Sequence, residues 1–164
     1  MRSHKGFTLV ELVVVIAIIG VLAAILVPSM ITYVKKARLK TSNGNAKTAY
    51  NGVVSFLIEK EIHGMTKTQI IADYCNKEVD CRVPPEMEMD DLQNEIHDTL
   101  EQNGIDSGIV FVGTDTIAGE AGYFVQWTKT VARGNDADIV GQYPSPPSWD
   151  YVKANGCTWK TYMK

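Results

Sequence analysis

The chain has 164 residues, a formal net charge of −3 and 45% hydrophobic residues, so it can hold one long helix and one small globular domain with a buried core. It contains no run of lysine and arginine of the kind that marks nucleic-acid-binding proteins. It also lacks a nucleophile–base motif, a phosphate-binding loop and a defined pair of acids, so we expect a protein that is not an enzyme.

The N-terminus combines a short basic segment with a long apolar one. Six residues that include Arg2 and Lys5 precede Phe7, and sixteen apolar or small residues run without interruption over residues 12–27. A secretory signal peptide has this order, but no small-x-small cleavage site follows closely and a helix-forming pattern continues beyond the run. A retained membrane anchor is therefore the better interpretation. The basic residues would hold its first end in the cytoplasm, and the rest of the chain would lie outside.

Glu11 is the only charged side chain in residues 7–34. A helix of these residues would be about 42 Å long, which is enough to cross a hydrocarbon core of roughly 30 Å. A carboxylate inside that core costs roughly 2.5–3.5 kcal/mol on insertion scales, so we expect Glu11 to have a function that offsets the cost. The alternative is a glutamate that lies in the water of the lipid headgroups.

Segment 6–12 reads G-F-T-L-V-E-L and stands between a basic leader and a long apolar helix. It resembles the class III signal of type IV pilins and of the related pseudopilins. The resemblance implies that a membrane peptidase removes residues 1–6 by cutting between Gly6 and Phe7. It also implies that the new N-terminus is methylated, so that Phe7 becomes N-methylphenylalanine. The free α-amino group of Phe7, on the same or an adjacent subunit, would then pair with Glu11 and set the register of helices packed in a filament.

Pro28 lies inside this helix and removes one backbone donor, which predicts a kink or a locally opened turn. Resemblance to pilins implies that the helix unwinds near this proline in the filament, and a kink without a function is the alternative. Lys35, Lys36, Arg38 and Lys40 form a basic collar, or simply a solvated helix face. Apolar residues then recur at three- and four-residue steps, which predicts that residues 35–63 are the amphipathic half of the same helix, with Gly64 as its stop.

Residues 64–164 are expected to form a globular head. The spacing of Thr66 and Gln69 is that of a capping box and predicts a short helix over 70–74, and the pattern over 90–102 predicts another. Strands are predicted over 108–113, 122–131 and 139–143, with a further short strand in the tail at 151–152 or 157–162. This order predicts an α+β fold that is type IV pilin-like: a long N-terminal helix, transmembrane in its first half, packs by its second half on a small antiparallel sheet.

Three cysteines, Cys75, Cys81 and Cys157, allow one disulfide and leave one thiol over. A bridge from Cys157 to either of the others would pin the C-terminal segment, as pilins often do. Cys75 with Cys81 would instead close a small loop, and the absence of any bridge is the third possibility. No tight cysteine or histidine spacing supports a metal site at these residues.

Asp136 and Asp138 alternate after a glycine and could supply oxygen ligands for calcium, although a solvated turn is the favoured interpretation. A similar Asp-Ala-Asp-Ile stretch occurs in the major pseudopilin of type II secretion, where calcium orders the loop. Several aromatic residues crowd the last quarter of the chain, where they either complete a small core or serve adhesion: Tyr143, Trp149, Tyr151, Trp159 and Tyr162.

We interpret the chain as a prepilin and favour the function of a major type IV pilin. A pseudopilin or minor pilin of a secretion or DNA-uptake machine is the alternative, and a monomeric anchored binding domain is a third class. The expected partners are further copies of the chain, a prepilin peptidase and methyltransferase, a membrane assembly platform and the lipid bilayer. The subunit would cross the cytoplasmic membrane once before it enters an extracellular filament. Apart from calcium at Asp136 and Asp138, where a solvated turn is favoured, no cofactor is expected.

Overall fold

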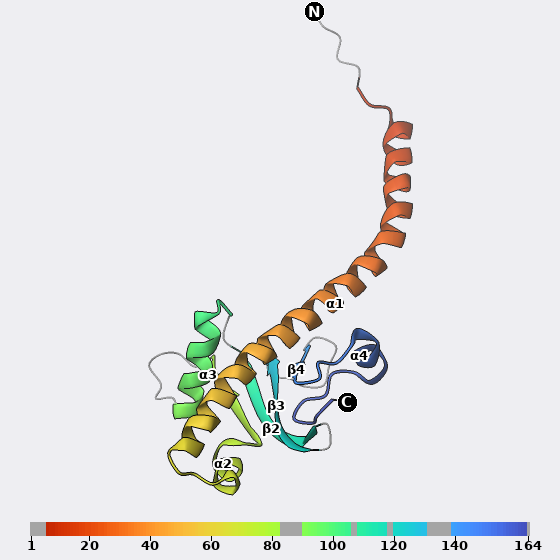
Figure 1. The fold of residues 1–164 in the computed structure, drawn as a ribbon. Coiled ribbons are helices and arrows are strands. Elements are labelled where there is room, and N and C mark those ends of the chain that lie inside the picture. The colour runs from red at the N-terminus through yellow and green to blue at the C-terminus, as the bar shows by residue number, and fades with distance from the viewer. Residues whose placement is uncertain (1–5, 83–89, 106–107, 118–119, 131–138, 164) are drawn as a thin grey trace, which may run out of the picture. The chain divides into compact units, whose positions relative to one another are not determined.

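The computed structural model describes residues 6–82, 90–105, 108–117, 120–130 and 139–163. They belong to two compact units, residues Met1–Ala37 and Arg38–Lys164. One helix, α1 (Leu9–Ile62), contributes its first part to the first unit and its second part to the second (Figure 1).

In the first unit α1 carries almost only apolar side chains, and all of residues 9–34 are exposed. This stretch is long and apolar enough to cross a membrane, and none of it is buried within the protein. The helix continues through Pro28, and the Thr32 hydroxyl donates a hydrogen bond of 3.3 Å to the Pro28 carbonyl. The locally opened turn predicted at Pro28 is therefore not formed in this structure. The kink predicted at Pro28 stays a prediction.

In the second unit α1 is amphipathic. Its buried residues recur at three- and four-residue steps and include Leu39, Ala46, Val53 and Phe56. The helix ends at Ile62, one residue before the predicted end. Gly64 follows with φ of +95°, a left-handed conformation that glycine adopts without the cost other residues incur.

Three short helices complete the second unit. Helix α2 (Lys67–Tyr74) begins with the predicted capping box, in which Thr66 and Gln69 exchange hydrogen bonds. Helix α3 (Asp91–Gln102) is capped by Asp90 and matches its prediction within one residue. Helix α4 (Trp149–Asn155) starts after Ser148, so the short strand predicted over 151–152 is wrong.

The sheet has four antiparallel strands in the order β1-β2-β3-β4. The three predicted strands are present as β2 (Ile109–Ile117), β3 (Glu120–Thr128) and β4 (Gly141–Tyr143). Strand β1 (Lys77–Asp80) was not predicted because its sequence, K-E-V-D, is mostly charged, which is typical of an edge strand. No strand forms over 157–162, where the chain has no regular structure.

Side chains of the sheet alternate between two buried faces. The face that bears Val110, Val112 and Val125 joins the core with α1 and α3. The opposite face, which bears Phe111 and Phe124, is covered by the C-terminal tail, residues 156–163 (Figure 1). Trp159 and Tyr162 lie on it with ring centroids 6.1 Å and 5.3 Å from the rings of Phe111 and Phe124. These two aromatic residues therefore complete a small second core.

Two fully buried glutamines hold the tail on this face. Gln126 and Gln142 are neighbours across β3 and β4, and their side chains share a hydrogen bond of 3.1 Å. Gln126 also binds the backbone of Thr158, Lys160 and Thr161, and Gln142 binds both the N–H and the carbonyl of Met163. Buried amides with this many partners fix the path of the chain around them.

The expected disulfides are not formed, since Cys75 and Cys81 are free, buried thiols. Strand β1 lies between these two residues and alone spans about 10 Å, which exceeds the Cα separation that a disulfide bridges. A bridge to Cys157 would have to pass from one face of the sheet to the other. Cys75 and Cys81 belong to the core on the α1 face, whereas Thr158, the neighbour of Cys157, binds Gln126 on the opposite face.

Candidate processing and assembly site

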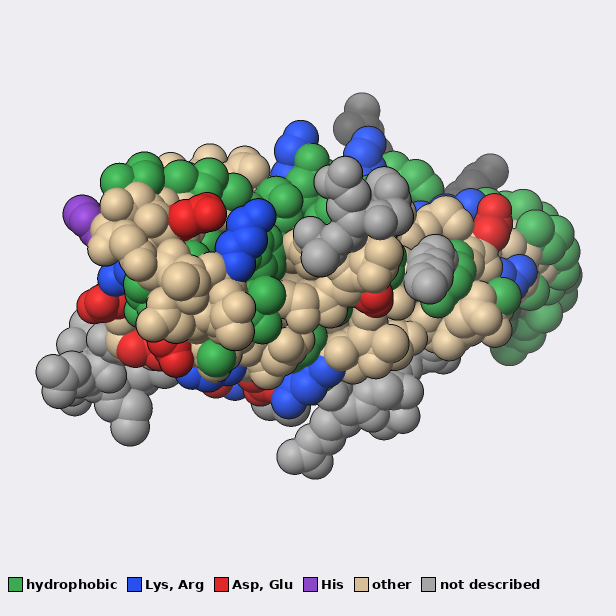
Figure 2. All heavy atoms as spheres, turned by 60° about the horizontal axis from the view of Figure 1, so that its bottom comes forward, with side chains coloured by type: hydrophobic (Ala, Val, Ile, Leu, Met, Phe, Trp, Pro, Cys, Tyr) green, Lys and Arg blue, Asp and Glu red, His purple; other side chains and the backbone are tan. Residues whose placement is uncertain are grey.

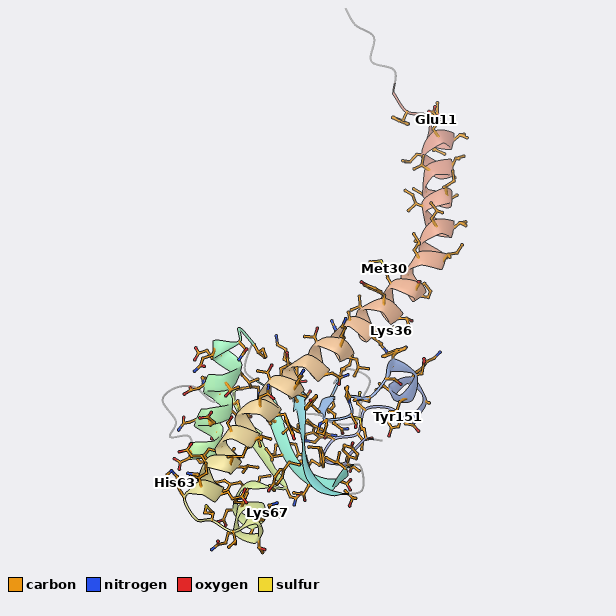
Figure 3. The ribbon with its side chains drawn as sticks, viewed as in Figure 1. Glu11, Met30, Lys36, His63, Lys67 and Tyr151 are labelled. Carbon is orange, nitrogen blue, oxygen red and sulfur yellow. The ribbon has the colours of Figure 1, made fainter. Side chains whose placement is uncertain are left out.

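The first turn of α1 is closed by a reciprocal cap between Thr8 and Glu11. The Thr8 backbone N–H and hydroxyl donate hydrogen bonds of 2.8 and 2.7 Å to Oε2 of Glu11, and the Glu11 N–H donates one of 3.3 Å to the Thr8 hydroxyl. The Thr8 carbonyl accepts the first helical hydrogen bond, from Leu12. This is a capping box, which satisfies backbone donors that a helix start otherwise leaves free. Figure 3 shows Glu11 at this end of the helix.

The sequence carried the signal for this cap, because Thr8-x-x-Glu11 has the same form as the box that predicted α2. We had expected only the charge of Glu11 to matter. The structure shows that its carboxylate also starts the helix, by binding through Oε2. A carboxylate offers about four acceptor sites, so the cap leaves capacity for a second partner.

The nitrogen of Phe7 is the closest source of a positive charge once the leader is removed. It lies one residue before the Thr8 nitrogen that Glu11 already binds, and backbone geometry places successive nitrogens no more than about 3.7 Å apart. A new α-amino group at Phe7 would therefore lie within about 6.5 Å of Oε2 without any change in α1.

The side chains around this charge are apolar and uncovered. Nineteen large hydrophobic residues between Phe7 and Val34 are 42–86% exposed. Burying a side chain of this size stabilises by about 1.5–3 kcal/mol, and even half of that, summed along the helix, exceeds the cost of burying one carboxylate several times over. Lipid or other apolar helices would cover this surface favourably, and either environment would also bury Glu11.

Of the other predicted site residues that the structure describes, only Gly6 and Phe7 lie at this end. Gly6 and Phe7 are exposed just before α1, and residues 1–5 of the leader lie outside the described residues. The calcium candidates Asp136 and Asp138 also lie outside them, so calcium binding there stays a prediction. Pro28 is in the middle of the apolar stretch, and the three cysteines are in the second unit.

One group of possible metal ligands was not predicted. His97, Asp98 and Glu101 lie on α3 with ligand atoms within 4.8 Å of one another, and the two carboxylates are exposed. The group is part of a wider acidic surface of α3 that includes Glu95. In the described ranges, the depressions beside β1 and beside α2 do not combine a nucleophile with a base, and they suggest no catalytic centre.

Comparison with known families matches two segments. Residues 1–27 match the family model described as the prokaryotic N-terminal methylation motif, and residues 59–107 match the one described as the peptidase dimerisation domain. The second match covers only part of the second unit and does not indicate catalysis. No solved structure matches the chain.

Several curated proteins are similar to about a third of the chain. The type IV major pilin protein PilA of Myxococcus xanthus is 41% identical over 58 residues, which are 35% of this chain and 26% of PilA. The type IV wide pilus major component PilA4 of Thermus thermophilus is 49% identical over 57 residues, 34% of this chain and 40% of PilA4. The type IV major alpha-pilin of Moraxella bovis is 42% identical over 59 residues, 36% of this chain and 37% of that pilin. The chain thus matches between about a quarter and two fifths of the length of these relatives.

Proposed function

We propose that this chain, whose N-terminal third is that of a type IV pilin family member, is the major structural subunit of an extracellular filament. The observation that carries the proposal is the first turn of α1. There one capped carboxylate stands at the start of a helix that is otherwise uncharged and exposed over residues 12–34. The N-terminal methylation motif matches this part of the chain, and three relatives whose names describe major pilins match about a third of the chain.

The subunit would be used in three steps. A prepilin peptidase cuts between Gly6 and Phe7 and the new amino group of Phe7 is methylated. The apolar half of α1 holds the processed subunit in the membrane, with its N-terminus on the cytoplasmic side. A membrane assembly platform then moves the helix from lipid into a bundle of identical helices, so that its apolar surface stays covered throughout.

Glu11 would supply the register of this bundle. A carboxylate that leaves the headgroup region needs a positive partner, because an unpaired buried charge is strongly destabilising. Only the Phe7 amino group offers one among residues 7–34, since Glu11 is the only other charge there. Copies that are shifted along the helix axis would leave both charges unpaired, and the correct stagger would pair them.

A pseudopilin or minor pilin is the second candidate. The stretch G-N-D-A-D-I at residues 134–139 favours it, because alternating aspartates of this kind suit a calcium-ordered loop. Assembly that requires calcium, and that is lost on Asp136→Ala/Asp138→Ala substitution, would favour the pseudopilin. Abundant long filaments that are insensitive to a chelator would favour the pilin.

Three substitutions at the first turn separate charge from capping. Glu11→Gln keeps an oxygen that can accept the capping hydrogen bonds but removes the charge, whereas Thr8→Val removes the two hydroxyl hydrogen bonds of the cap and keeps the charge. Thr8→Ser is the matched control that keeps both. We expect Glu11→Gln to reach the membrane at the wild-type level and to form at most a tenth of the wild-type amount of surface filaments. The reason is that each subunit in the filament loses one charge pair.

Thr8→Val should reduce filaments less than Glu11→Gln, and Thr8→Ser should not reduce them. Filaments and levels would be measured by shearing, electron microscopy and immunoblotting of membranes. Normal filament yield from Glu11→Gln would contradict the assembly role. It would instead support a monomeric anchored domain.

A further inference from the structure

Charge is separated along the chain in a way that filament formation by the N-terminal helix does not explain. Residues 12–58 contain five basic residues and no acid, whereas residues 59–105 contain twelve acids and four basic residues. On the face drawn in Figure 2 both signs are interspersed. The separation appears instead between two flanks of the second unit.

The two flanks lie on opposite sides of α1. Tyr50 and Gly52 are two residues apart and therefore point about 200° away from each other around the helix. The Tyr50 ring packs on Tyr143 of β4 with centroids 5.0 Å apart, whereas a Cβ at Gly52 would come within 2.6 Å of Thr99 of α3. Figure 1 shows α3 and β4 on the two sides of this part of the helix.

The β4 side forms a basic flank, which we define by Lys40 and Lys47. Both are exposed, and they are two helical turns apart on one side of α1. The Lys47 ammonium lies 5.7 Å from the centre of the Tyr143 ring, which fixes it beside β4. Among the described residues no carboxylate is within ion-pair distance of either lysine.

The other side forms an acidic flank, which we define by Glu95, Asp98 and Glu101. Helix α3 packs on the core through Leu92, Ile96 and Leu100, so these three carboxylates lie on its outer surface. Within the described ranges none of them has a lysine or arginine at ion-pair distance, and Asp98 is only 3.6 Å from the His97 ring.

The position of these acids in the helix favours a positively charged partner. Asp98 and Glu101 lie near the C-terminal end of α3, where the helix dipole disfavours negative charge and favours positive charge. The last turn of α3 contains no basic residue. A positively charged surface placed against this flank would therefore be attracted both by the carboxylates and by the negative end of the helix dipole.

We propose that the basic flank of one copy docks against the acidic flank of the next copy, side by side in the filament. This inference rests on the proposed function, because it needs copies whose α1 helices run parallel. The two flanks are different surfaces, so the contact is heterologous, and heterologous contacts that do not close a ring generate open helical assemblies. The partner is thus a second copy of this chain, chosen by complementary charge.

Charge reversal on each flank tests the contact. The acidic-flank variant is Asp98→Lys/Glu101→Lys, and the basic-flank variant is Lys40→Glu/Lys47→Glu. The control Glu59→Lys/Asp73→Lys is matched to the acidic-flank variant, because it makes the same change in net charge at exposed acids outside the acidic flank. Lysine near a helix C-terminus is favourable, so the acidic-flank variant should unfold at the wild-type temperature or above it.

Filament yield at low salt is the readout. We expect each single-flank variant to lose about tenfold in sheared filaments, because like charges then face each other. The control variant should not fall, and the chain that carries all four flank substitutions should recover, because complementarity is restored with opposite signs. Wild-type filaments should also weaken as salt is raised, since exposed pairs are screened within about 10 Å at 0.1 M.

Each other outcome has one meaning. Wild-type yield from both single-flank variants, or no recovery in the four-substitution chain, would overturn the docking contact and leave the proposed function standing. Loss of filaments on chelation of divalent cations that Asp136→Ala/Asp138→Ala does not reproduce, with the four-substitution chain inactive, would assign the acidic flank to a metal ion instead. Absence of wild-type filaments would overturn the proposed function itself, which is read from the unsubstituted chain.

Discussion

Replacing Gln142 by leucine should remove the anchor of the C-terminal tail. The side chain is fully buried and makes hydrogen bonds of 2.8 Å with both the N–H and the carbonyl of Met163 and one of 3.1 Å with the Ser145 carbonyl. Leucine has nearly the same size but leaves these three backbone groups unsatisfied. At about 1–1.5 kcal/mol for each, the free energy of unfolding should fall by about 3–5 kcal/mol.

Such a loss is a large part of the 5–15 kcal/mol that typically stabilises a domain, and it should lower the midpoint of thermal unfolding by roughly 10 °C. Near-ultraviolet circular dichroism of the full chain in detergent would record the midpoint. Gln102→Leu makes the same chemical change at an exposed position of α3 and serves as the control. A Gln142→Leu protein within about 1 kcal/mol of the wild type would refute this role of the amide.

Three further predictions concern the second unit. Gly141→Ala should destabilise it by about 3 kcal/mol or more, measured by chemical denaturation, because the added Cβ would lie 2.0 Å from the α1 backbone. Burial raises the pKa of Cys75 to about 11 and that of Cys81 to about 12, so iodoacetamide at neutral pH should label neither thiol until the protein unfolds, as peptide mass spectrometry would show. The hydrogen bond from Lys160 holds the pKa of Glu78 below its usual value, so this pair stabilises above the usual pKa and is lost as the pH falls through the lowered one. Lys160→Met should therefore lower the free energy of unfolding at pH 7 by under about 1 kcal/mol and should not lower it at about pH 3. An equal loss of free energy at both pH values would contradict the assignment.

The long helix and most of the sheet could be predicted because their patterns are periodic. The apolar run of α1, its change to a three- and four-residue repeat, and the apolar alternation of β2 and β3 each depend on the local sequence alone. Strand β1 could not be predicted in this way, since pairing with β2 and not its own charged sequence holds it in the sheet. Helix α4 did carry a signal, with Ser148 before it and Gly156 after it.

The anchoring of the tail could not be predicted from the sequence. Cysteines in an exported domain suggest a disulfide by residue type, but whether two of them can meet depends on which face of the sheet each one occupies. Gln126 and Gln142 look like ordinary polar residues in the sequence. Their role depends on the register of β3 with β4, which places them side by side under the tail.

The structure adds a contact to the predicted site, and the processing and assembly roles of its residues stay predictions. Glu11 was expected to act by its charge, and the structure adds its capping of the first turn through Thr8. Both roles use one carboxylate, and it has enough acceptor sites for both. The cap therefore holds the carboxylate close to the position of the amino group that processing would create.

Mass spectrometry of the N-terminus, on protein sheared from the cell surface and imaged for filaments, tests the central claim most directly. The account predicts an N-terminal peptide that starts at methylated Phe7, recovered in quantity from long filaments. Recovery of functional surface protein that still carries Met1 and the rest of the leader would contradict it.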